Sequence, residues 1–124
     1  RVLVNQVGDV NLLNNNKLTY DQTAVNIVAN NTPYVIATYS QTAYTTAKYI
    51  VQAQKDNTTH ESMEVLVITN NLGASYLTTY AVVNNGTPMG TLSTNVVGGN
   101  VNLYYTTTTN MVNANVKAMG TYIV

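Results

Sequence analysis

Three neighbouring stretches decide the fold: AKYIVQAQ at residues 47–54, ESMEVLVIT at residues 61–69 and YLTTYAVV at residues 76–83. Successive side chains of a β-strand point to opposite faces of its sheet, so alternation of apolar and polar residues indicates a strand with one buried face. The first stretch alternates in this way, and all three are rich in Tyr, Val, Ile and Thr, which favour strands. We therefore predict three consecutive antiparallel strands joined by polar loops.

The same alternation predicts how the first two strands pair. A register that places Val51 opposite Met63 and Tyr49 opposite Val65 keeps the apolar residues of both strands on one face, whereas a shift by one residue would not. This register also puts Lys48 diagonal to Glu64 on the other face, within reach of a weak ion pair.

The other face of these strands carries apolar residues too, namely Ile50, Leu66 and Ile68. A strand that is apolar on both sides is usually central and covered on both faces. Two explanations stay open: a second layer of the same domain covers this face, or the face is a subunit interface. Further interface candidates lie at the C-terminus and are Tyr122, Ile123 and Val124.

Turn signals divide the rest of the chain into short segments. We expect strands at residues 17–29, 34–39, 91–97, 101–105 and 114–124, and short apolar runs at residues 1–4 and 10–13. The clearest turn signals are Asn30-Asn31-Thr32-Pro33, the stretch from Asn84 to Gly90 with Asn85-Gly86 inside it, and Gly98-Gly99. Turns about every ten residues are typical of an all-β sandwich or barrel.

We therefore predict an all-β fold, an antiparallel β-sandwich that is jelly-roll-like. A chain of 124 residues is normally a single domain. Within it, residues 1–38 are expected to form N-terminal strands or an arm, and residues 39–124 the core meander.

Composition excludes several classes of function. Only 8% of the residues are charged and the formal net charge is zero, which argues against nucleic-acid binding and against a polybasic membrane surface. Asn and Thr make up roughly a third of the residues, far above ordinary usage. Tyr supplies all 10 aromatic residues. This composition is typical of an extracellular or particle-borne β-protein.

The chain has no Cys, which excludes zinc thiolate sites and cysteine nucleophiles. It contains no run of about eighteen apolar residues of the kind that spans a membrane. It begins with Arg1 and shows no signal-peptide pattern, as expected of a processed product or of a fragment of a longer chain.

The ionisable residues form no recognisable catalytic or metal-binding set. His60 is close in sequence to two Glu residues, but a zinc site needs three or more convergent ligands, so a solvated loop is the better interpretation. Glu61 and Glu64 fall on opposite faces of one strand, which rules out a glycosidase pair between them. Asp56 is an isolated turn acid that we expect to cap its own backbone. We predict no catalytic, metal or cofactor site.

Exposed tyrosine rings can stack on sugars, although Tyr is also common in cores and interfaces. The candidates for stacking are Tyr44, Tyr76, Tyr80, Tyr104 and Tyr105. Core or interface is the favoured interpretation of each. We keep Tyr44, Tyr76 and Tyr104 as candidate glycan contacts.

Several segments together resemble a β-sandwich domain of tailed-phage virion proteins. These segments are AKYIVQAQ, then Glu64 before VLVIT, then SYLTTYA, GGNVNLYYT and NVKA, and they cover roughly residues 39 to 118. Such domains occur in structural proteins of marine and T4-like phages, including fibre-, neck- and baseplate-associated ones. The resemblance implies a non-enzymatic structural role and offers no catalytic residues.

The leading hypothesis is a non-enzymatic structural component of a bacteriophage virion, such as a capsid decoration, neck, tail or fibre protein. It would act through contacts with other virion proteins and with copies of itself, in a homo-oligomer such as a trimer. The alternative is a carbohydrate- or receptor-binding β-sandwich module that contacts a host surface glycan.

Overall fold

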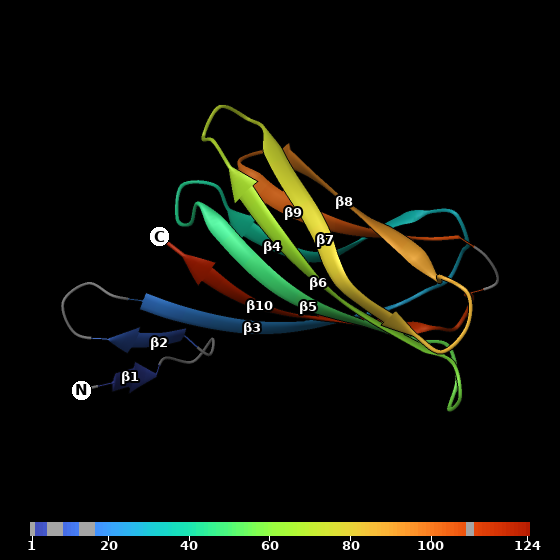
Figure 1. Ribbon diagram of the computed structural model, residues 1–124. Helices are drawn as coiled ribbons and strands as arrows, with labels where there is room; N and C mark the ends of the chain where they lie inside the picture. Colours follow the sequence, from blue (N-terminus) through green and yellow to red (C-terminus); the bar gives the residue numbers. More distant parts are fainter. Residues whose placement is uncertain (1, 5–8, 13–16, 109–110) are drawn as a thin grey trace.

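The computed structural model describes residues 2–4, 9–12, 17–108 and 111–124, which form two antiparallel sheets packed face to face (Figure 1). The strands are β1 Val2–Val4, β2 Asp9–Leu12, β3 Lys17–Asn26, β4 Pro33–Ser40, β5 Thr46–Gln54, β6 His60–Thr69, β7 Ser75–Asn84, β8 Gly90–Val97, β9 Asn100–Thr107 and β10 Asn115–Ile123. The larger sheet has the order β1-β2-β3-β10-β5-β6-β7, and the smaller sheet β4-β9-β8. The predicted antiparallel β-sandwich is confirmed. Within the described ranges, no helix could span a membrane.

The predicted meander is present as β5, β6 and β7, which lie side by side in chain order. Its register is also as predicted, because Tyr49 pairs with Val65 and Val51 pairs with Met63. All four of these side chains are buried against the smaller sheet. The alternation of the sequence therefore identified the inner face correctly.

Strands from the two ends of the chain complete both sheets. β3 pairs with β10 in the larger sheet, and β4 pairs with β9 in the smaller one. β4 spans residue 38, so the N-terminal segment continues into the sandwich without a break. Ile27 and Ile36 from this segment belong to the buried core.

β3 ends at Asn26, three residues earlier than the predicted strand of residues 17–29. Ile27 follows and is fully buried, and its backbone is tied to the start of β10. The Ile27 N–H donates to the Ala114 carbonyl at 2.8 Å, and the Ile27 carbonyl accepts from the Asn113 N–H at 2.8 Å. The chain leaves the larger sheet at this point because it crosses to the smaller one.

The turn at Gly98-Gly99 is a two-residue hairpin between β8 and β9, as predicted. Val97 pairs with Asn100, and both glycines have positive φ angles, 57° and 81°. This is the backbone that a type I′ turn requires and that glycine adopts without steric cost.

The Asn85-Gly86 turn signal predicts the positive φ angles of a primed turn, and this prediction is wrong. Neither residue is among those with positive φ. The reason is topological, since the connection from β7 to β8 crosses from one sheet to the other and closes no tight hairpin. Asn85 instead binds the neighbouring loop, with its side-chain oxygen accepting from the His60 N–H at 3.0 Å.

Candidate functional site

The outer face of the larger sheet carries apolar side chains in cross-strand rows. β10, β5, β6 and β7 are neighbours, and their register aligns Met119, Ile50, Glu64 and Tyr80 in one row. The next rows are Thr121, Lys48, Leu66 and Thr78, and then Ile123, Thr46, Ile68 and Tyr76. The outer apolar band, as we define it, consists of Ile50, Leu66, Ile68, Tyr76, Met119 and Ile123.

This band is open to solvent. Leu66, Ile50 and Ile68 keep 39%, 42% and 48% of their surface exposed. The smaller sheet packs on the opposite face, and the described part of the chain provides no second layer over the band (Figure 1). Of the two explanations left open by the sequence, a second layer of the same domain is therefore not found among the described residues. β6 was predicted to be central and covered on both faces. It is paired on both sides but lies one strand from the edge of the sheet, and it is covered on one face only.

One ion pair crosses the band. The Lys48 Nζ lies 3.6 Å from the Glu64 Oε1, which confirms the predicted diagonal pair. Both side chains are substantially exposed, so the pair contributes about 1 kcal/mol or less to stability. Its two charges cancel, which leaves the band without a net charge at this point.

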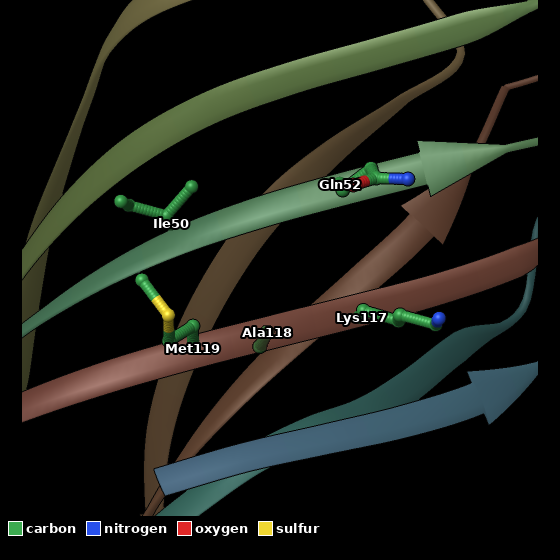
Figure 2. A pocket seen from close by; sticks show the side chains of 5 residues that line it. All are labelled: Ile50, Gln52, Lys117, Ala118 and Met119. Carbon is green, nitrogen blue, oxygen red and sulfur yellow. The ribbon is translucent and has the colours of Figure 1, made fainter. Parts of the chain in front are cut away.

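Two shallow hollows accompany the band. The first has a volume of about 230 Å³ and lies between β5 and β10, where it is lined by Ile50, Gln52, Lys117, Ala118 and Met119 (Figure 2). Figure 2 shows the Ile50 and Met119 side chains close to each other on adjacent strands. The second has a volume of about 190 Å³ and is lined by Leu66, Ile68, Tyr76, Leu77 and Thr78. Hollows of this size and lining suit an apolar side chain of a partner better than a reacting substrate.

The predicted interface residues divide between the two sides of the sheet. Ile50, Leu66, Ile68 and Ile123 lie in the outer apolar band, and Val124 is exposed just after β10. Tyr122 is only 4% exposed and belongs to the core, so its assignment to a surface is corrected. The correction follows from alternation, because Tyr122 and Ile123 are adjacent in one strand and must point to opposite faces.

Tyr122 is part of a cluster of tyrosine rings between the sheets. Its ring centroid lies 5.7 Å from that of Tyr39, 5.1 Å from that of Tyr44 and 5.7 Å from that of Tyr49. Burial raises the pKa of Tyr39 to about 12, with a smaller contribution from Tyr122. These rings hold one end of the sandwich together.

The three candidate glycan contacts do not share a surface. Tyr44 is packed against the core beside Tyr122. Tyr76 lies on the outer face of the larger sheet, and Tyr104 lies on β9 in the smaller sheet. Tyr105 is fully buried, which corrects its inclusion among exposed stacking candidates.

Glu61 points into the sandwich and is only 1% exposed. Its Oε1 accepts from the Tyr105 hydroxyl at 3.4 Å, and its Oε2 accepts from the Met89 N–H and the Asn84 amide, each at 3.3 Å. Burial raises the pKa of Tyr105, and the neighbouring Glu61 carboxylate raises it further. Glu61 thus joins the two sheets through hydrogen bonds.

The other ionisable residues near Glu61 point elsewhere. Glu64 lies on the outer face, so the prediction that these two carboxylates occupy opposite faces is confirmed. The His60 ring contacts the Asn57 carbonyl at 3.2 Å. Asp56 accepts from the Thr58 N–H at 2.8 Å, which lowers the pKa of the Asp56 carboxyl and confirms its capping role. The described residues include no group of three or more metal-ligating side chains.

Met119 belongs to the band but was not predicted to do so. It lies directly opposite Ile50, because β10 pairs with β5 across a long separation in sequence. Alternation along β10 would group Met119 with Thr121 and Ile123, but only the strand order shows that this group adjoins Ile50.

Comparison with known proteins supports the fold and leaves the family open. No protein-family model matches the chain, and no curated protein matches it. Among solved structures, it is similar to the tailspike protein of Acinetobacter baumannii phage AM24, with a TM-score of 0.53 and 11% sequence identity. The match covers 86% of this chain and 26% of the tailspike chain, so the chain spans about a quarter of that protein.

Proposed function

We propose that the chain is a non-enzymatic structural module of a bacteriophage tail, held in its particle by subunit contacts through the outer apolar band. The observation that carries the proposal is an uncovered sheet face on which six apolar or aromatic side chains cross four strands. The likeness to a phage tailspike supports a place in the tail. A neck, fibre or capsid-decoration role would use the same face.

The physical argument for contact rests on the cost of leaving the band in water. Each buried Å² of apolar surface contributes about 25 cal/mol, and large contiguous apolar patches on a protein surface usually mark interaction sites. The hollows beside Ile50 and Leu66 can accept side chains of a partner. The Lys48 to Glu64 pair leaves no uncompensated charge in the centre of such a contact.

A structural role also agrees with where the carboxylates lie. Glu61 is committed to hydrogen bonds between the sheets, and Glu64 is paired with Lys48 on the outside. A glycoside hydrolase needs two carboxyl groups on either side of one bond, and these two lie on opposite faces of a strand. We therefore propose a module that binds other subunits and catalyses no reaction.

The proposed assembly is a closed homo-oligomer, such as a trimer, within a set of other virion proteins. Leu66→Glu should dissociate it, because the new carboxylate would be buried in the contact beside Lys48, whose charge is already paired with Glu64. We expect the native mass from light scattering to fall below that of the unmodified chain, because the contact through the band is lost. The fold should survive, since Leu66 is exposed in the single chain and lies opposite Lys48.

The matched control is Thr91→Glu, which adds the same charge at an exposed position of β8 in the smaller sheet. Its native mass should equal that of the unmodified chain. If Leu66→Glu leaves both assembly and stability unchanged, the band is not a subunit contact. A wild-type monomer at all concentrations would likewise count against the proposal.

The carbohydrate-binding alternative stays a prediction from sequence. It needs tyrosine rings that converge on one sugar, and Tyr44, Tyr76 and Tyr104 belong to three different environments. No observation gathers them into a common platform.

A further inference from the structure

The edge strand β7 offers a second way for copies of the chain to associate. β7 closes the larger sheet and is hydrogen-bonded to β6 along one side (Figure 1). Along its other side, no described strand pairs with it through the backbone, although the Thr94 hydroxyl of β8 in the smaller sheet donates to the Ser75 hydroxyl at 3.1 Å. An edge of this kind presents a row of backbone N–H and C=O groups that match another strand.

The hydrogen bonds of β6 show which backbone N–H and C=O groups of β7 face the free edge. The Thr69 N–H donates to the Thr45 carbonyl at 3.0 Å, so this residue of β6 directs its backbone groups away from β7. Backbone direction alternates along a strand, and Ile68 and Leu66 therefore direct theirs toward β7. In the observed register their partners on β7 are Tyr76 and Thr78. The intervening residues, Leu77 and Thr79, direct their N–H and C=O groups to the free edge.

β7 lacks two of the features that normally block edge pairing. It contains no charged residue and no Pro, and the whole stretch from residue 65 to residue 116 is uncharged. A β-bulge is present, since Ala81 and Val82 together oppose Met63. The bulge ends the regular part of the edge, which leaves residues 75–80 for pairing.

The sequence of this part is symmetric on its outer face. Tyr76, Thr78 and Tyr80 point to that face in succession, so the strand carries one Tyr on each side of a central Thr. A strand with this order is complementary to itself when it is turned end to end. A charged strand would meet its own charges in that arrangement, and β7 has none.

We propose that β7 pairs antiparallel with β7 of a second copy, about a two-fold axis through Thr78. Leu77 would then exchange two backbone hydrogen bonds with Thr79 of the second copy, and the symmetric pair would do the same. These are the residues whose backbone groups face the free edge. Tyr76 lies opposite Tyr80 of the second copy, as an aromatic cross-strand pair. The result is one continuous sheet through two chains.

This proposal is independent of the outer apolar band. Edge pairing is carried by the backbone of β7, whereas the proposed function uses side chains on the outer face of β10, β5, β6 and β7. Tyr76 is the residue that belongs to both contacts. A two-fold edge contact produces an even number of chains. If the band also holds three copies together, the two contacts combine to give a hexamer, whereas a trimer by itself lacks the edge contact.

The first test removes one free N–H. Thr79→Pro deletes a donor that faces the edge and leaves the ladder to β6 intact, which is the setting in which a strand tolerates Pro. We expect light scattering to show an even number of chains in the wild-type assembly. In Thr79→Pro, the native mass should be half of the wild-type value. Thr79→Val, which keeps the N–H, should retain the wild-type mass. An unchanged mass in folded Thr79→Pro, or an odd-numbered or monomeric wild-type chain, overturns the proposal.

The second test detects the contact directly by cross-linking and does not require a variant that weakens it. The chain has no Cys, so Thr78→Cys introduces a single thiol that would meet itself at the two-fold axis. Residues opposite each other in a non-hydrogen-bonded pair have the closest side chains. Mild oxidation should give a covalent dimer on a non-reducing gel. Ser62→Cys, exposed on the same face but on β6, which is paired on both sides, should stay monomeric on the gel. Equal cross-linking of the two variants, or none at Thr78→Cys, overturns the proposal.

Discussion

Gly120 on β10 lies directly across from Tyr49 on β5, and the tyrosine ring covers the glycine. A Cβ atom at Gly120 would lie 2.6 Å from the Tyr49 Cε1 and 2.8 Å from the Tyr122 hydroxyl oxygen. Both neighbours are buried in the tyrosine cluster, so neither can move aside freely. The close approach of ring and backbone depends on the missing side chain.

Gly120→Ala should therefore destabilise the protein. Overpacking of a core typically costs about 1–3 kcal/mol, and we expect a loss of that size in the free energy of unfolding measured with urea. Gly86→Ala is the matched control, because a Cβ at Gly86 would meet no atom within 4 Å. It should change the free energy by about 0.5 kcal/mol or less. Equal losses in both variants would contradict the packing argument.

Single residues also show which side-chain positions the sequence predicts and which it does not. Alternation places Ile50 and Leu66 on the outer face without any further information. Alternation does not predict the surroundings of Tyr105 and Gly120, because their burial depends on which strand lies opposite. The same holds for the Tyr105 hydroxyl, whose partner Glu61 is 44 residues away in sequence.

At the scale of elements, the β-bulge in β7 is the clearest departure from regular structure. Ser62 pairs with Val83 and Glu64 pairs with Tyr80, so Ala81 and Val82 share the position opposite Met63. Ala81 has a φ of 50°, in the left-handed region that glycine favours over other residues. A bulge of this kind bends the strand and increases its twist.

Ala81→Gly should stabilise the protein, against the usual effect of glycine in a strand. The left-handed conformation costs an L-residue about 1–2 kcal/mol, and the added freedom of glycine in the unfolded chain costs about 0.4–1 kcal/mol. A net gain of about 0.5 kcal/mol in urea unfolding is expected. Ala24→Gly in β3 is the control, as an exposed strand alanine without a positive φ. It should lose about 0.5–1 kcal/mol, and the same sign in both variants would refute the strain at Ala81.

The meander was predictable as a set of elements because its contacts are local. Short loops join β5, β6 and β7, so alternation and loop length suffice to choose a register. The pairing of β10 with both β3 and β5 brings together distant segments, and no local pattern in the sequence specifies it. For the same reason, sequence alone left open whether the outer face was covered.

At the scale of the whole molecule, most charged side chains of the sandwich and most buried tyrosines lie toward different faces of the larger sheet, with the buried Glu61 carboxylate beside Tyr105 as an exception. Lys48, Glu64 and Lys117 lie on β5, β6 and β10, whereas the described strands β4, β7, β8 and β9 carry no charged residue. The buried tyrosines instead lie between the sheets, at Tyr39, Tyr49, Tyr105 and Tyr122. The buried tyrosine hydroxyls are thus neutral in the folded protein, and ionising them would destabilise the packing between the two sheets.

Stability should consequently fall in alkaline solution. The pKa of Tyr39 is raised from 10.0 to about 12 by burial, and the pKa of Tyr105 is raised as well. Between pH 10 and pH 12 the unfolded chain releases these protons while the folded chain retains them, so unfolding becomes more favourable as the pH rises. At about 1.4 kcal/mol for each pKa unit, Tyr39 alone removes about 2 kcal/mol by pH 12, where the folded group is itself half ionised. Below pH 9 neither group should contribute to any pH dependence.

Urea unfolding at a series of pH values, with Tyr39→Phe as the variant, measures this loss. The Tyr39 hydroxyl is buried and has no hydrogen-bond partner among the described residues, so its removal should leave stability at pH 7 equal or slightly higher. Above pH 10 the decline should be shallower than in the wild-type chain, because one shifted group is gone. Tyr76→Phe, which removes an exposed hydroxyl, should follow the wild-type profile. If Tyr39→Phe declines as steeply as the wild type, Tyr39 is not a source of the alkaline instability, and the tyrosine cluster must be solvated more than its burial indicates.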